Sequence, residues 1–441
     1  MKINFGKDSS IKYNQDASVI WDSKKVINGH MLLVGKSGTG KTYTFKNVIQ
    51  QLEQQSQGKL RVHIIDVHGD IEIDNSSTVK FSESTNYGFN PIAINPDPDF
   101  GGVRKKIQSF ISALNRSTAK LGHKQESVLR NILVDLYMAN GFYDGKPDTW
   151  KLFNPNGSPI TYNGKEKRNP TLSDAYRYAN FKLRGMFLGT SNKSVSHLEN
   201  LNKKVNSFYK KQKSLIKATT DSEKQSIEKE ILDIKHQCIE SYSSYINSIE
   251  NGMELSDLIR YDSKDVMKSV VEKLENLNAI GIFKPEPPPF DKGASVWRYD
   301  IKALNLNEKK LFVSFVLDNI FYKRVQEGVQ DDLREIIILD EAHNFFSDDT
   351  DNIINIIAKE ARKFGLGLFC ASQSPTHFSE DFISNVGTKI ILGIDQTFWN
   401  GSVQKLKIEQ SALEWIVPHK KMVIQINNKG ELRNKFTWTY I

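Results

Sequence analysis

The sequence predicts an α/β protein in which a parallel sheet with crossover helices is interrupted by a long helical segment. Three observations lead to this prediction. A glycine-rich loop at residues 35–42 joins an apolar strand to a helix, and a second apolar strand follows at residues 60–66. The same alternation of strands and helices returns after residue 293. Strands joined through a helix pair in parallel, because a parallel connection needs a crossover.

The glycine-rich loop fits the pattern G-x-x-x-x-G-K-[ST] and follows an apolar strand at residues 31–34. In this pattern, backbone N–H groups surround phosphate oxygens at the N-terminus of the next helix. We expect Lys41 to reach the β- and γ-phosphates, and the Thr42 hydroxyl to coordinate Mg²⁺. The predicted nucleotide-binding residues are Gly35, Lys36, Ser37, Gly38, Thr39, Gly40, Lys41 and Thr42.

Helical spacing dominates the segment between residues 101 and 292. Apolar side chains within residues 125–137 fall on one helix face, and a polar loop rich in Gly and Asn follows at residues 140–169. We therefore predict a core domain at residues 1–100 and 293–441, with an inserted helical domain at residues 101–292.

Residues 195–250 predict an antiparallel helical hairpin within the inserted domain. Thr220 and Glu223 have the spacing of a capping box that begins the second helix. Apolar residues recur at steps of three or four in each arm: Val195, Leu198, Leu201, Val205 and Phe208, then Ile227, Ile231, Ile234 and Cys238. The first arm is basic, with Lys203, Lys204, Lys210, Lys211, Lys213 and Lys217. Either the basic arm is neutralised by acids on the second arm, or it docks DNA or a partner.

Strands return after the hairpin at residues 296–301, 334–339, 366–371 and 389–393, with a helix at residues 308–327. Two acids, Asp340 and Glu341, directly follow the second of these strands. We expect Asp340 to hold Mg²⁺ together with Thr42, and Glu341 to orient and deprotonate the attacking water. The letters of residues 340–343 also occur in two-domain RNA helicases, but the long spacing from the P-loop argues against that class.

Two further positions are candidates for the catalytic site. Gln373 follows a buried strand and is expected to sense the γ-phosphate, unless it only bonds backbone at the strand end. Arg362 and Lys363 lie at a helix end. Cations favour a helix C-terminus in any case, but an arginine there could also act on a neighbouring subunit's ATP.

Composition sets broad limits on the function. Lys and Arg number 60 against 52 acids, which gives a net charge of +8 and a pI near 9.0. This mild basicity suits a nucleic-acid partner, although it is also an ordinary surface property. We see no apolar run of bilayer length and no signal peptide, so we expect a cytoplasmic protein without membrane contact. Cys238 and Cys370 have no metal-ligand spacing and are interpreted as small apolar residues.

Taken together, these motifs resemble the HerA branch of the HerA/FtsK ATPases, which are hexameric DNA translocases. The stretches that carry the resemblance are residues 28–42, 65–70, 89–91, 338–344, 360–367, 371–375 and 384–388. The resemblance implies a RecA-like core of the additional-strand type, hexameric rings and ATP sites between subunits.

The resemblance also implies roles for individual residues. Asp340 and Glu341 match the Walker B acids, Gln373 matches the polar sensor, and Arg362 matches an arginine that acts in trans. Asp66, His68 and Asp70 match a loop near the γ-phosphate, where either a catalytic or a loop-shaping role is open. HerA proteins usually carry an N-terminal β-barrel before the P-loop, whereas only about thirty residues precede it in this sequence.

The function implied by the resemblance is an ATPase that uses Mg²⁺ and ATP to translocate double-stranded DNA as a homohexameric ring. Family members work with a nuclease or a Sir2-like effector in DNA end processing or anti-phage defence. Two alternatives stay open: an ATP-regulated scaffold that assembles an effector with little translocation, and a conjugative or packaging ATPase with the same core.

Overall fold

The computed structural model folds into two compact units. The first comprises Met1–Asn90, Ser112–Lys120 and Gly281–Ile441, and the second comprises Pro91–Ile111 and Leu121–Ile280. The boundaries of these units differ from the predicted domain boundaries: residues 91–100 lie in the second unit and residues 281–292 in the first. The predicted division into a core domain and an inserted domain stays a prediction. The structure describes residues 1–11, 17–188, 192–218, 220–248, 260–261, 263–347, 349, 352–431 and 435–441.

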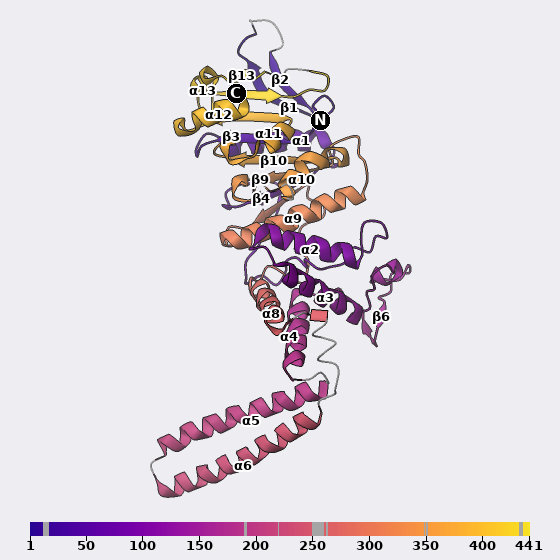
Figure 1. The fold of residues 1–441 in the computed structure, drawn as a ribbon. Helices are drawn as coiled ribbons and strands as arrows, with labels where there is room; N and C mark the ends of the chain where they lie inside the picture. The colour runs from indigo at the N-terminus through magenta and orange to yellow at the C-terminus, as the bar shows by residue number, and fades with distance from the viewer. Residues whose placement is uncertain are drawn as a thin grey trace. The chain divides into compact units, whose positions relative to one another are not determined.

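The first unit is built on a sheet that, in the described residues, has 11 strands in the order β2-β1-β13-β12-β11-β3-β10-β9-β4-β8-β5. Neighbours from β11 to β5 run parallel, and the strands from β12 to β2 add to one edge in antiparallel fashion. The two chain ends thus meet on the neighbouring strands β1 and β13 (Figure 1). The strand bounds are β1 Lys2–Asp8, β2 Ser18–Asp22, β3 Met31–Gly35, β4 Arg61–Asp66, β5 Ser77–Lys80, β8 Val296–Asp300, β9 Glu335–Leu339, β10 Leu366–Ser372, β11 Thr388–Gly393, β12 Lys421–Ile426 and β13 Thr437–Tyr440.

The position of β10 confirms the predicted fold class. β10 pairs in parallel with β3 on one side, where Ala371 is opposite Leu33, and with β9 on the other, where Phe369 is opposite Ile338. The strand that precedes the P-loop and the strand that precedes the acid pair are therefore separated by one additional strand. All residues of β3, β9 and β10 are buried, as expected for parallel strands covered on both faces.

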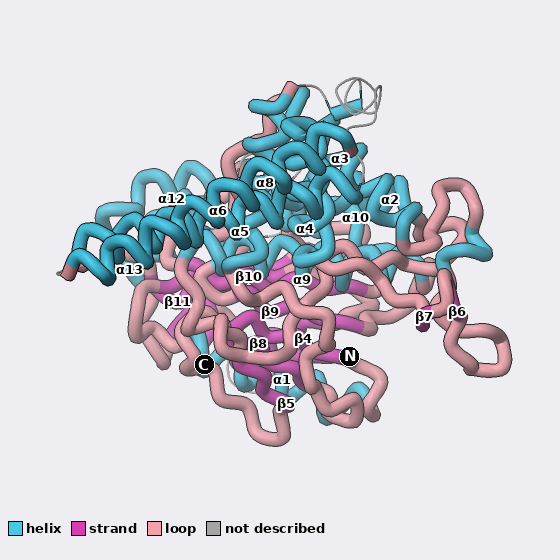
Figure 2. The backbone as a smooth tube through the Cα atoms, turned by 90° about the horizontal axis from the view of Figure 1, so that it is seen from below, coloured by secondary structure: helices cyan, strands magenta, loops and turns pink. Residues whose placement is uncertain are grey.

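Helices cover both faces of this sheet (Figure 2). Helix α1 packs its apolar stripe, which includes Phe45, Val48 and Leu52, on alternate residues of the central strands, such as Leu33 and Ile338. α9 and α10 lie on the opposite face (Figure 2). The bounds of the first unit's helices are α1 Lys41–Ser56, α9 Leu306–Gln326, α10 Ile353–Glu360, α11 Glu380–Asn385, α12 Trp399–Leu406 and α13 Gln410–Trp415.

The second unit is mainly helical. Its predicted polar loop contains a small two-stranded ribbon, β6 Thr161–Tyr162 with β7 Lys165–Glu166. Its helices are α3 His123–Ala139, α4 Leu172–Leu188, α5 Asn192–Lys217, α6 Asp221–Asn247 and α8 Lys264–Ala279, and α2 Val103–Ser117 crosses from this unit into the first. None of the described helices combines the length and the apolar character that crossing a bilayer requires.

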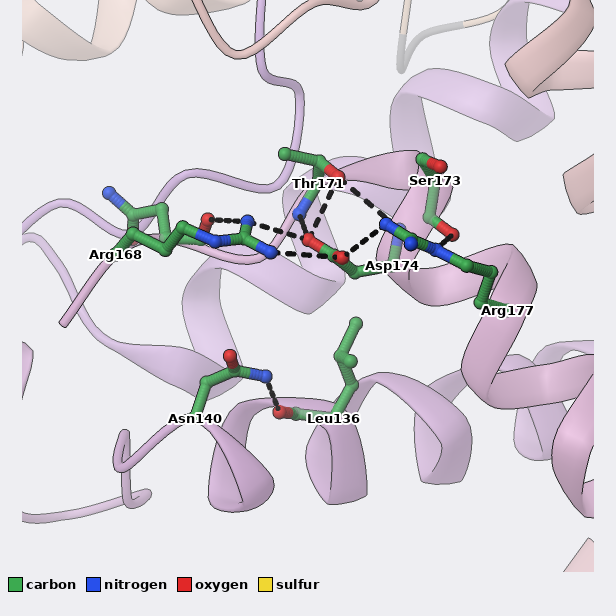
Figure 3. Close-up of polar contacts among 8 residues, drawn as sticks. Leu136, Asn140, Arg168, Thr171, Ser173, Asp174 and Arg177 are labelled. Atoms are coloured by element: carbon green, nitrogen blue, oxygen red, sulfur yellow. Dashed lines mark hydrogen bonds and ion pairs between the residues drawn. The ribbon is translucent and has the colours of Figure 1, made fainter. Parts of the chain in front are cut away.

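One carboxylate organises the start of α4 (Figure 3). Asp174 accepts hydrogen bonds from the Thr171 backbone N–H at 2.9 Å and from Arg168 Nη1 at 2.8 Å, and it pairs with Arg177 Nη2 at 3.0 Å. Burial alone would raise the pKa of Asp174, but these hydrogen bonds outweigh it and hold the pKa at about 2. An acid in the first turn also interacts favourably with the helix dipole.

Helices α5 and α6 form the predicted hairpin, but one residue was assigned to the wrong face. Val205 is 47% exposed, whereas Phe208 is half-buried and contacts the second arm through Lys235. Among the lysines of α5, Lys211 pairs with Glu230 and Lys204 bonds Gln237. The arms therefore neutralise part of each other's charge, while Lys203, Lys210, Lys213 and Lys217 stay exposed. The side chains of Val195 and Leu198, and residues 249 and 250, lie outside the described part of the chain.

A buried histidine predicts a loss of stability in acid. His30 is fully buried before β3, and its Nδ1 accepts a hydrogen bond from the Leu368 N–H at 3.1 Å. Burial lowers the pKa of His30 from 6.5 to about 4. Because the unfolded chain then binds more protons between pH 6.5 and 4, the free energy of unfolding should fall through this window by about 3 kcal/mol.

The variant His30→Asn keeps an acceptor for Leu368 but does not titrate in this range. In urea unfolding at pH 7.5 and pH 4, the wild type should lose about 3 kcal/mol more than the variant. An equal loss in both proteins would show that His30 is not the group responsible.

Candidate functional site

The P-loop follows β3 at the carboxyl edge of the parallel strands. Lys41 Nζ donates to the Gly35 carbonyl at 2.8 Å, and Thr39 Oγ1 donates to the Lys36 carbonyl at 2.8 Å. Helix α1 begins at Lys41, and this fully described helix has no side-chain hydrogen bond at its N-cap, Gly40. Its first N–H groups are therefore left for a ligand, and an anion is the ligand that a helix N-terminus favours.

A histidine from the far end of the chain packs on this loop. His419 Nε2 lies 2.9 Å from the Gly38 carbonyl oxygen, and a Cβ added to Gly40 would meet the His419 ring at 3.2 Å. Gly40 also has φ +99°, a conformation that disfavours other residues. Sequence reasoning missed His419, because no motif surrounds it and 381 positions separate it from Gly38.

The acid pair lies at the same edge of the sheet, after β9. Asp340 and Glu341 are 8% and 9% exposed. Burial, and then the charge of Glu341, raise the pKa of Asp340 to about 6, while the charge of Lys41 lowers it. The P-loop lysine and the acid pair thus belong to one electrostatic site, although about 300 residues of sequence separate them.

Glu341 has a left-handed backbone, with φ 46° and ψ 43°. This region is uncommon for a non-glycine residue and costs energy unless the surroundings hold it. His419, which packs on the P-loop, shares this conformation with φ 63°. Residues with such backbones concentrate at functional sites.

Two residues of the loop after β4 have different surroundings: Asp66 bonds the loop itself, and His68 lies near the acid pair. Asp66 is fully buried and accepts backbone hydrogen bonds from Gly69 at 2.7 Å and Ile71 at 3.0 Å, and it pairs with Arg298 at 2.7 Å. These contacts favour the loop-shaping role for Asp66. The imidazole of His68 comes close to the acid pair instead: one ligand atom each from His68, Asp340 and Glu341 lie within 4.8 Å of one another. Asp70 is exposed.

Gln373 lies at the same edge, directly after β10. Its side chain is exposed, and the strand before it runs between the P-loop strand and the strand of the acid pair. The sequence prediction that Gln373 lies between these two motifs agrees with this strand order.

Arg362 and Lys363 are not brought to the site of their own chain. Both are exposed in the turn Ala361–Phe364, which precedes β10, so they lie at the opposite edge of the sheet from the P-loop. The seven residues of β10 separate the two edges by roughly 20 Å. Arg362 and Lys363 line an open cavity of about 550 Å³ at that edge.

Comparison with known proteins agrees with this architecture. The family model described as "Helicase HerA, central domain" matches residues 9–236, more than half of the chain. The "DNA double-strand break repair helicase HerA" of Pyrococcus furiosus is 32% identical over 128 residues, which cover 22% of this chain and 23% of that protein. The "Probable helicase MJECL08" of Methanocaldococcus jannaschii is 22% identical over 407 residues, covering 87% of this chain and 60% of that protein. The chain thus spans less than two thirds of each of these relatives.

Solved structures share the fold at low sequence identity. VirB4 of Thermoanaerobacter pseudethanolicus superposes with a TM-score of 0.57 at 13% identity, over 99% of this chain and 95% of that one. The bacterial conjugative coupling protein TrwB superposes with a TM-score of 0.51 at 9% identity, over 96% of this chain and 89% of that one. The sheet of this chain has an added strand between the P-loop strand and the strand of the acid pair. Because the family model also matches more than half of the chain, the chain belongs to the HerA helicase family, whose central ATPase domain it carries.

Proposed function

We propose that this chain is a motor ATPase that hydrolyses ATP to move along, or to clamp, double-stranded DNA. The observation that carries the proposal is the meeting of Lys41, the acid pair and the end of β10 at one edge of the sheet. The relatives named as HerA helicases support DNA as the substrate.

The residues at this edge fit ATP with Mg²⁺. Asp340 is a buried carboxylate whose pKa is raised by burial and by Glu341, so a cation beside it would offset an existing electrostatic cost. Carboxylate and hydroxyl oxygens are ligands that Mg²⁺ prefers, and Asp340 and Thr42 would supply them. Bound Mg²⁺ would neutralise charge on the phosphates.

Hydrolysis needs a base and a group that senses the phosphate. Glu341 would accept a proton from the attacking water, and Lys41 would leave the Gly35 carbonyl to hold the β- and γ-phosphates. Gln373, at the end of the intervening strand, would contact the γ-phosphate and report its loss.

The position of Arg362 supports an ATP site to which a second subunit contributes a residue. At the edge opposite its own P-loop, Arg362 would act on the ATP of a neighbour, as a head-to-tail ring requires. We propose a homohexamer in which Lys363 assists at the same interface.

DNA would be gripped through its phosphates, without sequence readout. The four exposed lysines of α5 are candidates for this contact or for binding a partner. The effector that we propose is a nuclease or a Sir2-like enzyme, acting in DNA end processing or in anti-phage defence.

The experiment that tests the proposed function is an ATPase assay with and without linear duplex DNA, combined with light scattering. We expect DNA to raise the rate, and a mass near six times that of the 50.3 kDa chain. A rate indifferent to DNA, from a monomer, would favour an ATP-regulated scaffold for an effector. Pumping of single-stranded DNA in place of duplex would favour a conjugative coupling motor.

A further inference from the structure

A chain of polar contacts joins Glu341 to the end of β10. His343 Nδ1 lies 3.3 Å from Glu341 Oε2 and 3.4 Å from Ser372 Oγ. Ser372 Oγ lies in turn 3.1 Å from His377 Nδ1, and the two imidazole rings are 4.8 Å apart. Ser372 is fully buried and directly precedes the predicted sensor Gln373.

The chemistry of the carboxylate favours one proton placement on His343. An ionised carboxylate can only accept, so its contact with His343 is favourable when Nδ1 of His343 carries the proton. The Ser372 hydroxyl can then accept from His343 and donate its one proton either to His377 Nδ1 at 3.1 Å or to the Ser374 carbonyl oxygen at 3.3 Å. Burial lowers the pKa of both His343 and His377, which favours neutral imidazoles in this chain of contacts.

The His343 contact matters because Glu341 Oε2 has little else. Oε2 is buried and makes no well-formed hydrogen bond among the described residues, and His343 Nδ1 lies 3.3 Å from it. The left-handed backbone of Glu341 adds strain that its surroundings must balance. A contact longer than an ideal hydrogen bond is common in catalytic sites before the substrate binds.

We propose that His343 is a positioning residue for the ATPase reaction: its Nδ1–H orients the Glu341 carboxylate. Ser372 connects His343 to the segment that carries Gln373. One N–H lies almost equally far from Glu341 and from Ser372, so a small shift at the end of β10 changes how strongly Glu341 is held. This proposal rests on the proposed ATPase function and adds His343 and Ser372 to it.

The test compares three substitutions at position 343. Asn places an N–H close to the position of Nδ1, Gln places it farther out, and Ala removes it. We expect His343→Ala and His343→Gln to lower kcat about 10- to 100-fold, the scale known for hydrogen bonds that orient metal ligands, with KM for ATP unchanged. His343→Asn should recover most of kcat. Binding of a fluorescent ATP analogue and thermal melting are measured on every variant. They separate a misoriented Glu341 carboxylate from a loss of folding.

A double-mutant cycle completes the test. In a Glu341→Gln background, His343→Ala should have no further effect on the residual rate, because the group it aims has gone. Multiplying effects, or equal kcat for the Asn, Gln and Ala variants, would overturn the role of His343 alone. A wild-type protein without ATPase activity would instead refute the proposed function, and with it the role of His343.

Discussion

Glu341→Gln is expected to lower the rate of ATP hydrolysis by about 10²–10⁴-fold while leaving ATP binding intact. The amide has nearly the shape of the carboxylate but cannot take a proton from water. Single-turnover hydrolysis and equilibrium binding of a fluorescent ATP analogue measure the two effects separately. Glu414→Gln, on the exposed face of α13, is the matched control and should hydrolyse ATP at the wild-type rate.

The same variant separates a motor from a scaffold. A motor should lose DNA translocation together with hydrolysis, whereas a scaffold held in its ATP state should keep its assembled effector. Retention of full hydrolysis in Glu341→Gln would place the base elsewhere and contradict the site described here.

Arg362→Ala is expected to lower hydrolysis by about 10³-fold or more, the effect of removing an arginine finger. In the structure Arg362 lies at the sheet edge opposite its own P-loop, so the loss should appear only in assembled protein. Lys363→Ala is the comparison variant and should lose less, because the Lys363 ammonium lies 5.1 Å from the ring centre of Phe364 in its own chain and is held there by a cation–π contact.

Mixing two inactive variants tests whether Arg362 acts in trans. An Arg362→Ala subunit has an intact ATP site, and a Glu341→Gln subunit has an intact arginine. In a head-to-tail ring assembled at random from equal amounts, about a quarter of the interfaces combine both intact parts, so about a quarter of the activity should return. No recovery in subunits that demonstrably exchange would contradict action in trans.

The predictions from sequence succeeded where the signal is local. The P-loop pattern and the strand before the acid pair are short segments whose residue types and spacing reflect their own secondary structure, and β3 and β9 begin and end within a residue of the predicted bounds. The hairpin was predicted for the same reason, since apolar steps of three or four mark a helix. Val205 was misassigned because periodicity alone allows more than one face of a long helix to be the buried one.

Contacts between distant segments were beyond this reasoning. The pairing of β1 with β13 is made by backbone hydrogen bonds, so the side chains of the two strands do not reveal which strand pairs with which. The sequence leaves open whether Asp66 is catalytic or structural, and its pairing with Arg298, 232 positions away, favours the structural role. His343 stood beside the acid pair in the sequence, but its link to Ser372 required β10 to lie next to β9.

The sequence by itself determined the class of chemistry, because phosphate binding by a P-loop needs only one strand, one loop and one helix in a fixed order. It also determined that an acid pair follows a buried strand. Only the tertiary structure decided that β10 lies between those two strands, that His419 packs on Gly40, and that Arg362 faces away from its own site. The physical reason is that these facts are set by sheet order and long-range packing, which depend on the whole chain and leave no mark on the residues nearby.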